Sequence, residues 1–176
     1  DRFTQAAHQQ CVRHLQRRCQ ELLETAVRGA VYLPRAVLAL IDQAFELRRA
    51  WRGHRLSGDA LARKGWALTG RLRCLVHGRF THEPNRRLAQ HIEQHANAWF
   101  WFLIDPTIQA TNHWAERAIR PAVVNRKVWG GNRTWLGAQA QSVLMSVIRT
   151  SLQRGRDAFN DLLQLICPPA PQLQTA

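Results

Sequence analysis

The chain has 176 residues, of which 25 are Lys or Arg and 12 are Asp or Glu, giving a formal net charge of +13. With 45% hydrophobic residues and seven Trp, the composition excludes a disordered segment and supplies enough apolar material for one packed core. No apolar run approaches the ~20 residues that span a bilayer, which excludes a membrane-spanning protein.

The excess of positive charge indicates an anionic partner, and nucleic acid is the leading candidate. Only Lys64 and Lys127 are lysines, so 23 of the 25 basic residues are Arg. The guanidinium group pairs bidentately with phosphate, which suits contacts with nucleic acid. A general replacement of Lys by Arg in the genome would explain this bias equally well, but it would not explain the net charge.

Apolar residues at steps of three and four predict four helices in the first hundred residues. These helices cover residues 8–27, 34–52, 59–76 and 84–103. Pro34 and Pro84 fit the first turns of their helices, and the fourth helix ends at Asp105-Pro106. Gly65 and Gly70 weaken the third helix, each by roughly 1 kcal/mol relative to Ala.

Shorter elements are predicted for residues 105–176. A polar helix over 112–119 is stopped or kinked by Pro121, and 124–137 is expected to be a loop. Two further helices are predicted, one over 138–153 and one that Asp157 caps at its N-terminus. Short β pieces fit 8–12 and the region of Val123, and the tail 167–176 is expected to be disordered. The predicted fold class is mainly α.

The segment from Thr111 to Gly137 contains five basic residues and a single acid, Glu116. A carboxylate surrounded by arginines is stabilised as the anion, and it could bind Mg²⁺ while the arginines hold substrate phosphates. The alternative is structural, because Glu116 and Arg120 stand at i and i+4, where they would form an ordinary ion pair on a solvated helix.

Residues 129–135 offer a second candidate for ligand binding, because they combine two glycines, Asn132 and Arg133 with a Trp at either end. Glycines let the backbone approach a ligand closely, and Arg with Trp can bind phosphate and stack on bases. The alternative is an ordinary loop whose tryptophans fill the core. The pattern is not a P-loop, because no GxxxxGK[ST] sequence is present.

The four cysteines are expected to be free thiols in a reducing cytoplasm, because no apolar signal segment is seen at the start. A zinc site could be assembled from His8, Cys11, His14 and Cys19, but this spacing matches no standard structural zinc pattern. A buried cysteine with histidines at the surface is the alternative.

The run TNHWAERAIRP, from Thr111 to Pro121, resembles the TNN-x-AER-x-x-RP signature of the insertion sequence 66 family of transposases. His113 departs from it, since a second Asn is common there. Residues 124–137, the helix around Ser146 and the upstream pattern Cys11-x-x-His14-x-x-Arg17 are also similar to this family.

The resemblance implies a DDE transposase, whose ribonuclease-H-like core holds two Mg²⁺ or Mn²⁺ ions with two Asp and one Glu. Glu116 would be the third of these acids, catalytic and metal-binding. Contacts to transposon-end and target DNA are then expected from basic and amide side chains, namely Arg117, Arg120, Arg126, Lys127, Asn132 and Arg133. The family further implies bacterial, cytoplasmic, DNA-associated action, with homo-oligomers or accessory transposition proteins as further partners.

One departure from the family pattern bears on activity. The Asp-Gly-aromatic motif of the second catalytic Asp is absent before Cys11, and Asp1 is expected to be a bystander. Both aspartates are therefore expected upstream, together with most of the sheet. Residues 1–104 would be a helical insertion, and 105–166 would carry the Glu-bearing helix, the basic loop and the C-terminal helices of the catalytic domain. Alone, the chain is expected to be inactive and to bind no metal tightly. The alternative is a non-catalytic, basic helical DNA-binding protein or transposase remnant.

Overall fold

A computed structural model describes residues 8–167 of the chain. Within this range the chain forms eight α-helices and no strand, so the mainly α fold class is confirmed. The short β pieces predicted at 8–12 and near Val123 are wrong, and Val123 lies inside a helix. None of these helices has the length and apolar content that crossing a membrane requires.

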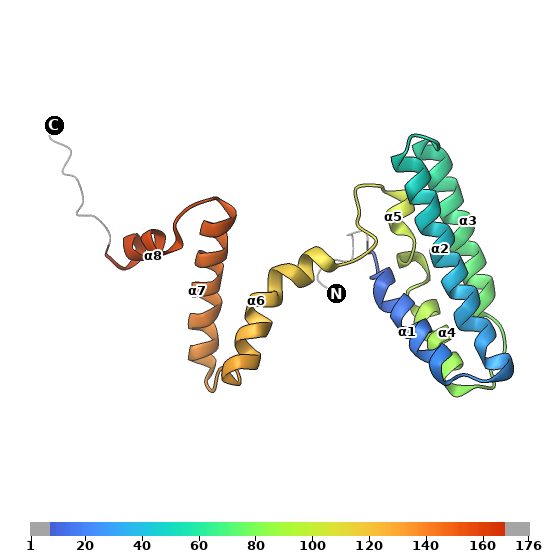
Figure 1. Cartoon of the computed structure of the whole chain (residues 1–176), viewed down its shortest axis with the longest axis horizontal. Coiled ribbons are helices and arrows are strands. Elements are labelled where there is room, and N and C mark those ends of the chain that lie inside the picture. The colour runs from blue at the N-terminus through green and yellow to red at the C-terminus, as the bar shows by residue number, and fades with distance from the viewer. Residues whose placement is uncertain (1–7, 168–176) are drawn as a thin grey trace. The chain divides into compact units, whose positions relative to one another are not determined.

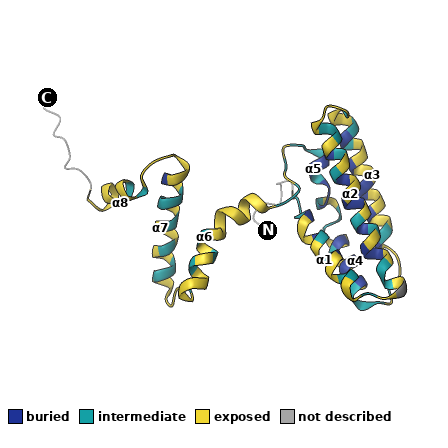
Figure 2. Cartoon of the chain, viewed as in Figure 1, coloured by how far each residue is buried: buried dark blue, intermediate teal, exposed yellow. Residues whose placement is uncertain are grey.

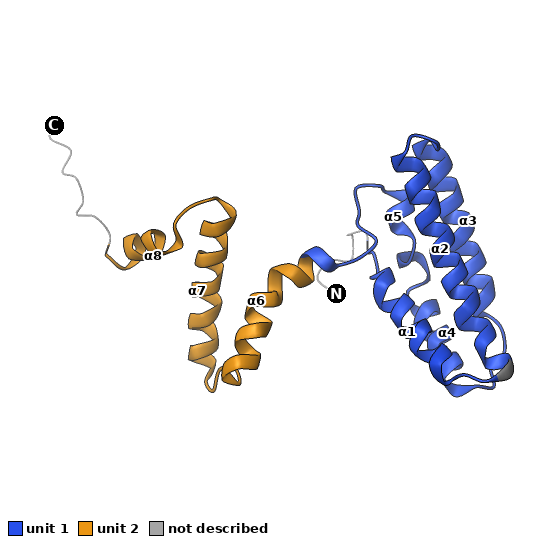
Figure 3. Ribbon diagram, in the orientation of Figure 1, with its two compact units in different colours: residues 1–114 blue, residues 115–176 orange. Residues whose placement is uncertain are grey.

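The helices belong to two compact units, residues 1–114 and residues 115–176, which are described separately (Figure 3). The division predicted between residues 104 and 105 stays a prediction. Asp1 and, apart from Cys167, the tail predicted to be disordered lie outside the described residues.

The first unit is a helical bundle around one apolar core (Figure 1). The longest helix, α2 (Tyr32–Arg52), packs against both α1 (Val12–Thr25) and α3 (Gly58–Val76). In turn, α3 packs against α4 (Glu83–Gln94) and the short α5 (Trp101–Ile104). Two 3₁₀ turns, η1 (Arg28–Val31) and η2 (Ala96–Ala98), complete the unit.

The predicted helix over 59–76 is confirmed, because α3 covers residues 58–76 and buries one apolar face. The prediction of one helix over 84–103 is wrong. The helix α4 ends at Gln94, and the chain turns through η2 before α5 begins. The reason lies in tertiary packing, since Trp99, Phe100 and Phe102 are all buried and no single helical stripe could hold all three. The indole of Trp99 donates a hydrogen bond to the carbonyl of Ile92 at 3.0 Å.

The two glycines of α3 have different roles. A Cβ at Gly65 would lie 2.9 Å from the Cβ of Leu103, so this glycine permits the close approach of α5. A Cβ at Gly70 would meet no atom within 4 Å. The fold therefore requires Gly65, whereas Gly70 only weakens the helix.

The segment that enters the bundle, residues 9–12, is hydrogen-bonded to the exit segment, residues 98–110, through which the chain leaves it. The N–H groups of Gln10 and Val12 donate to the carbonyls of Ala98 and Ala110, at 2.7 and 3.0 Å. The side chain of Gln9 adds hydrogen bonds to the backbone of the same exit segment. The two ends of the helical bundle therefore lie side by side.

A buried arginine holds the exit segment against α2. The guanidinium of Arg48, only 7% exposed, donates to the carbonyls of Phe102 and Pro106 and lies 5.0 Å from the ring centre of Trp51. Burial lowers the pKa of Arg48 from its ordinary value. The carbonyl hydrogen bonds and the indole face offset the loss of water around this charge.

The second unit begins within α6 (His113–Trp129) and continues with α7 (Trp135–Gln153) and α8 (Ala158–Ile166). The expected loop over 124–137 is wrong for residues 124–129, because α6 continues past Pro121, and for residues 135–137, which begin α7. A proline in a helix removes one hydrogen bond and bends the axis without always ending it, and α6 is visibly bent (Figure 1). The connection to α7 is short and contains Gly130 and Gly131, at φ values of +78° and +90°.

The described residues of the second unit, 115–167, form no apolar core of their own. Among its described residues only Ser151 is buried, whereas the first unit has many buried apolar side chains (Figure 2). Large apolar side chains of α6, α7 and α8 are exposed, including Val128, Leu136, Phe159 and Ile166 at 71–79%. These helices therefore present apolar faces that nothing within residues 115–167 covers.

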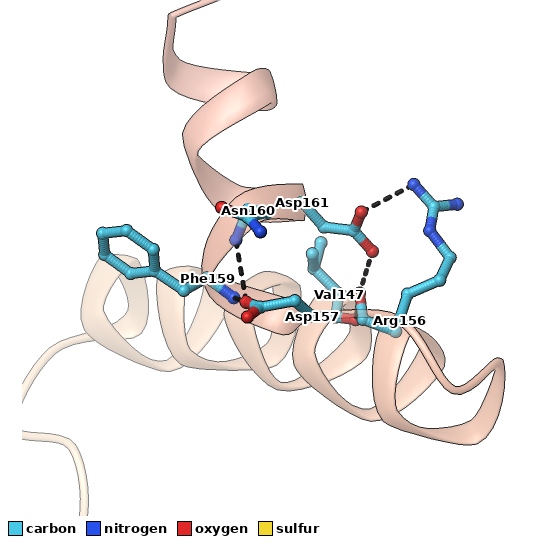
Figure 4. Close-up of polar contacts among 7 residues, drawn as sticks. Val147, Arg156, Asp157, Phe159, Asn160 and Asp161 are labelled. Atoms are coloured by element: carbon cyan, nitrogen blue, oxygen red, sulfur yellow. Dashed lines mark hydrogen bonds and ion pairs between the residues drawn. The ribbon is translucent and has the colours of Figure 1, made fainter.

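The corner between α7 and α8 is held by polar contacts instead (Figure 4). The predicted cap is confirmed, since the Asp157 carboxylate accepts hydrogen bonds from the N–H groups of Phe159 and Asn160. The Asp161 carboxylate accepts from the hydroxyl of Ser151 at 2.5 Å and from Arg156 at 2.6 Å. The hydrogen bond from Ser151, and then Arg156, lower the pKa of Asp161.

We expect the substitutions Gly65→Ala and Gly70→Ala to change the stability of the first unit in opposite directions. Gly70→Ala should raise the free energy of unfolding by up to about 1 kcal/mol, because it improves helix propensity at an open position. Gly65→Ala should lower it by about 1–3 kcal/mol, because the added methyl displaces Leu103. Urea denaturation followed by Trp fluorescence measures both, and equal shifts of one sign would contradict the role given to Gly65.

Asp161→Asn should loosen α8 in a pH-dependent manner. Because the folded-state pKa of Asp161 is depressed, its stabilisation is complete above the ordinary Asp pKa and is lost as the pH falls through the folded value. Amide exchange in α8, compared between variant and wild type at each pH, should differ at neutral pH and converge in acid. Asp42→Asn, at an exposed position of α2, is the control. A difference that persists unchanged in acid would show that the carboxylate charge is not involved.

Candidate nucleic-acid interface

The candidate carboxylate is carried by the first turn of α6. Glu116 is exposed there, and the sequence spacing places Arg120 and Lys127 on the same side of the helix, at i+4 and i+11. Arg117 is also exposed. One side of α6 thus combines a single carboxylate with basic groups, as expected from the sequence.

The other predicted basic residues lie at the end of α6 and in the turn that follows. Arg126, Lys127 and Arg133 are exposed, and within residues 8–167 their charged groups form no ion pair and no hydrogen bond. By contrast, Glu83 of the first unit pairs with both Arg86 and Arg87. The positive charge of this part of α6 is not neutralised by the described protein, which leaves it available to an external anion.

The two tryptophans beside the glycine turn do not fill a core. Trp129 and Trp135 are 60% and 78% exposed, so the interpretation of residues 129–135 as a loop with core-filling tryptophans is wrong. The turn is ordered by side-chain contacts, because the Asn132 amide donates to Gln141 and the Thr134 hydroxyl accepts from the N–H of Gly137. Its aromatic faces are open to solvent, which is the arrangement that base stacking requires.

A groove of about 490 Å³ separates α6 from α7. The α6 wall includes Ile119 and Arg126, and the turn contributes Gly131 and Asn132. The α7 wall was missed from the sequence and consists of residues one turn apart, including Gln141, Ser142, Met145, Ser146 and Arg149. Their repeat at steps of three and four was the signal that could have identified them.

The described residues do not complete a metal site. No three His, Cys, Asp or Glu side chains between residues 8 and 167 lie close enough together to hold an ion. A metal bound at Glu116 would find one carboxylate there and not a full set of ligands, since two metals in phosphodiester chemistry require several carboxylates.

The zinc site considered for His8, Cys11, His14 and Cys19 is likewise not assembled among the described residues. Cys19 is completely buried in the core, and this burial raises the pKa of its thiol to about 12. A thiol with this pKa stays protonated near neutral pH, whereas zinc requires the thiolate.

Comparison with known proteins gives one clear match. A family model described as "Transposase IS66 family" matches residues 1–140, which include the whole helical bundle, α6 and the glycine turn. No curated protein and no solved structure matches the chain.

Proposed function

Because the chain belongs to the IS66 family of transposases, we propose that it binds transposon DNA through α6 and the glycine turn. The observation that carries this proposal is the position of Glu116 and of five basic side chains, all on one segment inside the matched region. The exposed, unneutralised charge of Arg126, Lys127 and Arg133 supports binding to phosphates.

We further propose that Glu116 is one of the carboxylates required for metal-dependent DNA cleavage and strand transfer. Transposases of the DDE type use Mg²⁺ or Mn²⁺ to polarise the phosphodiester and activate the attacking oxygen. The described residues supply only part of such a site. The proposal for this chain is therefore limited to Glu116 as a single ligand, with the remaining carboxylates coming from polypeptide other than residues 8–167.

Two features support the proposed place of this chain in a ribonuclease-H-like core. The bundle of the first unit has adjacent ends, at Val12 and Ala110, which is what a helical insertion between two parts of a domain needs. The helices of the second unit expose apolar faces. Helices that pack on a sheet expose such faces when the sheet is not among the described residues.

A second candidate function is a non-catalytic DNA-binding remnant of a transposase. The exposed basic side chains of α6 and the glycine turn favour it, because they can bind phosphates without a metal ion. The two candidates share DNA binding and differ in whether the carboxylate of Glu116 matters.

The double variant Arg117→Gln/Arg120→Gln should weaken binding to duplex DNA. Each lost phosphate contact should reduce the slope of log K against log salt by about 0.9, so two contacts reduce it by about 1.8. Fluorescence anisotropy over a salt series measures this change. Arg63→Gln/Arg73→Gln, which removes the same charge from exposed positions of α3, is the control and should leave the slope nearly unchanged. Equal effects of the two double variants would contradict a localised interface.

Glu116→Gln should abolish transposition without weakening DNA binding. Loss of a metal-binding carboxylate should reduce the frequency by at least ~100-fold when the native gene mobilises a marked element. Glu24→Gln, at an exposed position of α1, should transpose normally. Undiminished transposition by Glu116→Gln would contradict the proposed role of this carboxylate, and a wild-type gene that mobilises nothing would favour the non-catalytic candidate. Cleavage by purified 1–176 with Mg²⁺, lost in Glu116→Gln, would contradict the proposal that further carboxylates are needed.

A further inference from the structure

The groove between α6 and α7 has two chemically distinct parts. Its apolar lining consists of small or flexible side chains, namely Ala118, Ile119, Ala122, Ala138 and Met145. Its polar lining consists of amides, hydroxyls and two arginines, with no Asp or Glu. A ligand that fits both parts carries negative charge along one side and flat apolar surface on the other.

The two arginines stand on different helices, Arg126 on α6 and Arg149 on α7. Within residues 8–167 neither guanidinium has a hydrogen-bond or ion-pair partner. On α6, Arg126 stands ten residues after Glu116, which turns it away from the side shared by Glu116, Arg120 and Lys127. The groove is therefore a second basic surface, separate from the one that carries the carboxylate.

We propose that this groove binds an unpaired DNA strand. Arg126 and Arg149 would hold phosphates from the two walls, and the alanines with Met145 would receive base faces. The side-chain amides of Asn132 and Gln141, which are hydrogen-bonded to each other at the turn, keep the Asn132 oxygen and the Gln141 NH₂ for base edges. This inference rests on the proposed function and adds a substrate class to it, namely unpaired DNA. It also assigns α7 to DNA binding and requires that the strands separate.

An unpaired strand fits this groove better than a duplex does. In a duplex the base faces are buried in the stack, so only phosphates could touch the groove, and its apolar lining would stay unused. In single-strand binding a basic groove follows the backbone while aromatic side chains stack on bases. Trp129 and Trp135 stand at the turn that closes one end of the groove, with their rings exposed.

The test compares binding of a fluorescein-labelled oligothymidylate with binding of a duplex of equal length, using purified 1–176. Arg126→Gln/Arg149→Gln should weaken binding to the single strand about tenfold or more, whereas binding to the duplex should lose only the one phosphate contact proposed above for Arg126. Its salt slope for the single strand should fall by about 1.4, for two contacts of about 0.7 each. Because neither arginine has a partner among the described residues, circular dichroism should show an unchanged fold.

A second variant and a crosslinking experiment keep the inference falsifiable. Trp129→Ala/Trp135→Ala should also weaken single-strand binding selectively, whereas Trp66→Ala, an exposed tryptophan of α3, should not. Photocrosslinking with an iodouracil-substituted oligonucleotide should label peptides from residues 129–149.

Three results would overturn the inference, and two of them come from the variants and crosslinks above. One is an equal loss of single-strand and duplex binding in the Arg126/Arg149 variant, and the other is crosslinks confined to the first unit. Unchanged single-strand binding would also overturn it and would leave a protein segment as the occupant of the groove. The proposed function is judged separately, since it fails only if Arg117→Gln/Arg120→Gln leaves duplex binding intact.

Discussion

The first unit depends on the buried guanidinium of Arg48. Through this group α2 donates hydrogen bonds to the carbonyls of Phe102 and Pro106. These carbonyls lie where the bundle ends and the segment before α6 begins. Main-chain carbonyls at the end of a helix and beyond it have no donor within the helix. A buried arginine can donate hydrogen bonds to two such carbonyls at once. The contacts between Val12 and Ala110 and between Gln10 and Ala98 then join entry and exit around this anchored segment.

The two units differ in how much of their apolar surface is buried and in which contacts join their helices. The first buries its aromatic residues, with Trp99, Phe100 and Phe102 packed into a continuous core. The second keeps its helices together through caps and ion pairs, such as Asp157 with the start of α8 and Asp161 with Ser151 and Arg156. Side chains that are not packed in a core stay available for ligands. The second unit contains exposed tryptophans and arginines that have no partner within residues 8–167.

Local signals in the sequence predicted much of this structure. The apolar spacing of α3 and the cap at Asp157 depend on neighbouring residues alone, and both predictions are confirmed. The break between Gln94 and Trp101 could not be predicted, because it follows from burying consecutive aromatic residues against distant helices. The continuation of α6 through Pro121 was missed because the glycine pair that follows suggested a longer loop.

For the candidate interface, the motif around Glu116 pointed to the basic residues of α6. Helix geometry then separates the side with Glu116, Arg120 and Lys127 from the groove lined by Arg126. The contribution of Arg149 and Gln141 depends on how α7 is turned relative to α6, which no local pattern specifies.

The meeting of Gln10 and Val12 with Ala98 and Ala110 also has an evolutionary consequence. A bundle whose two ends are joined by backbone hydrogen bonds can be gained, lost or exchanged as one genetic cassette, because its removal leaves a gap that a short linker bridges. Lineages could therefore vary this module in length and surface charge while the residues of the proposed DNA interface keep their places.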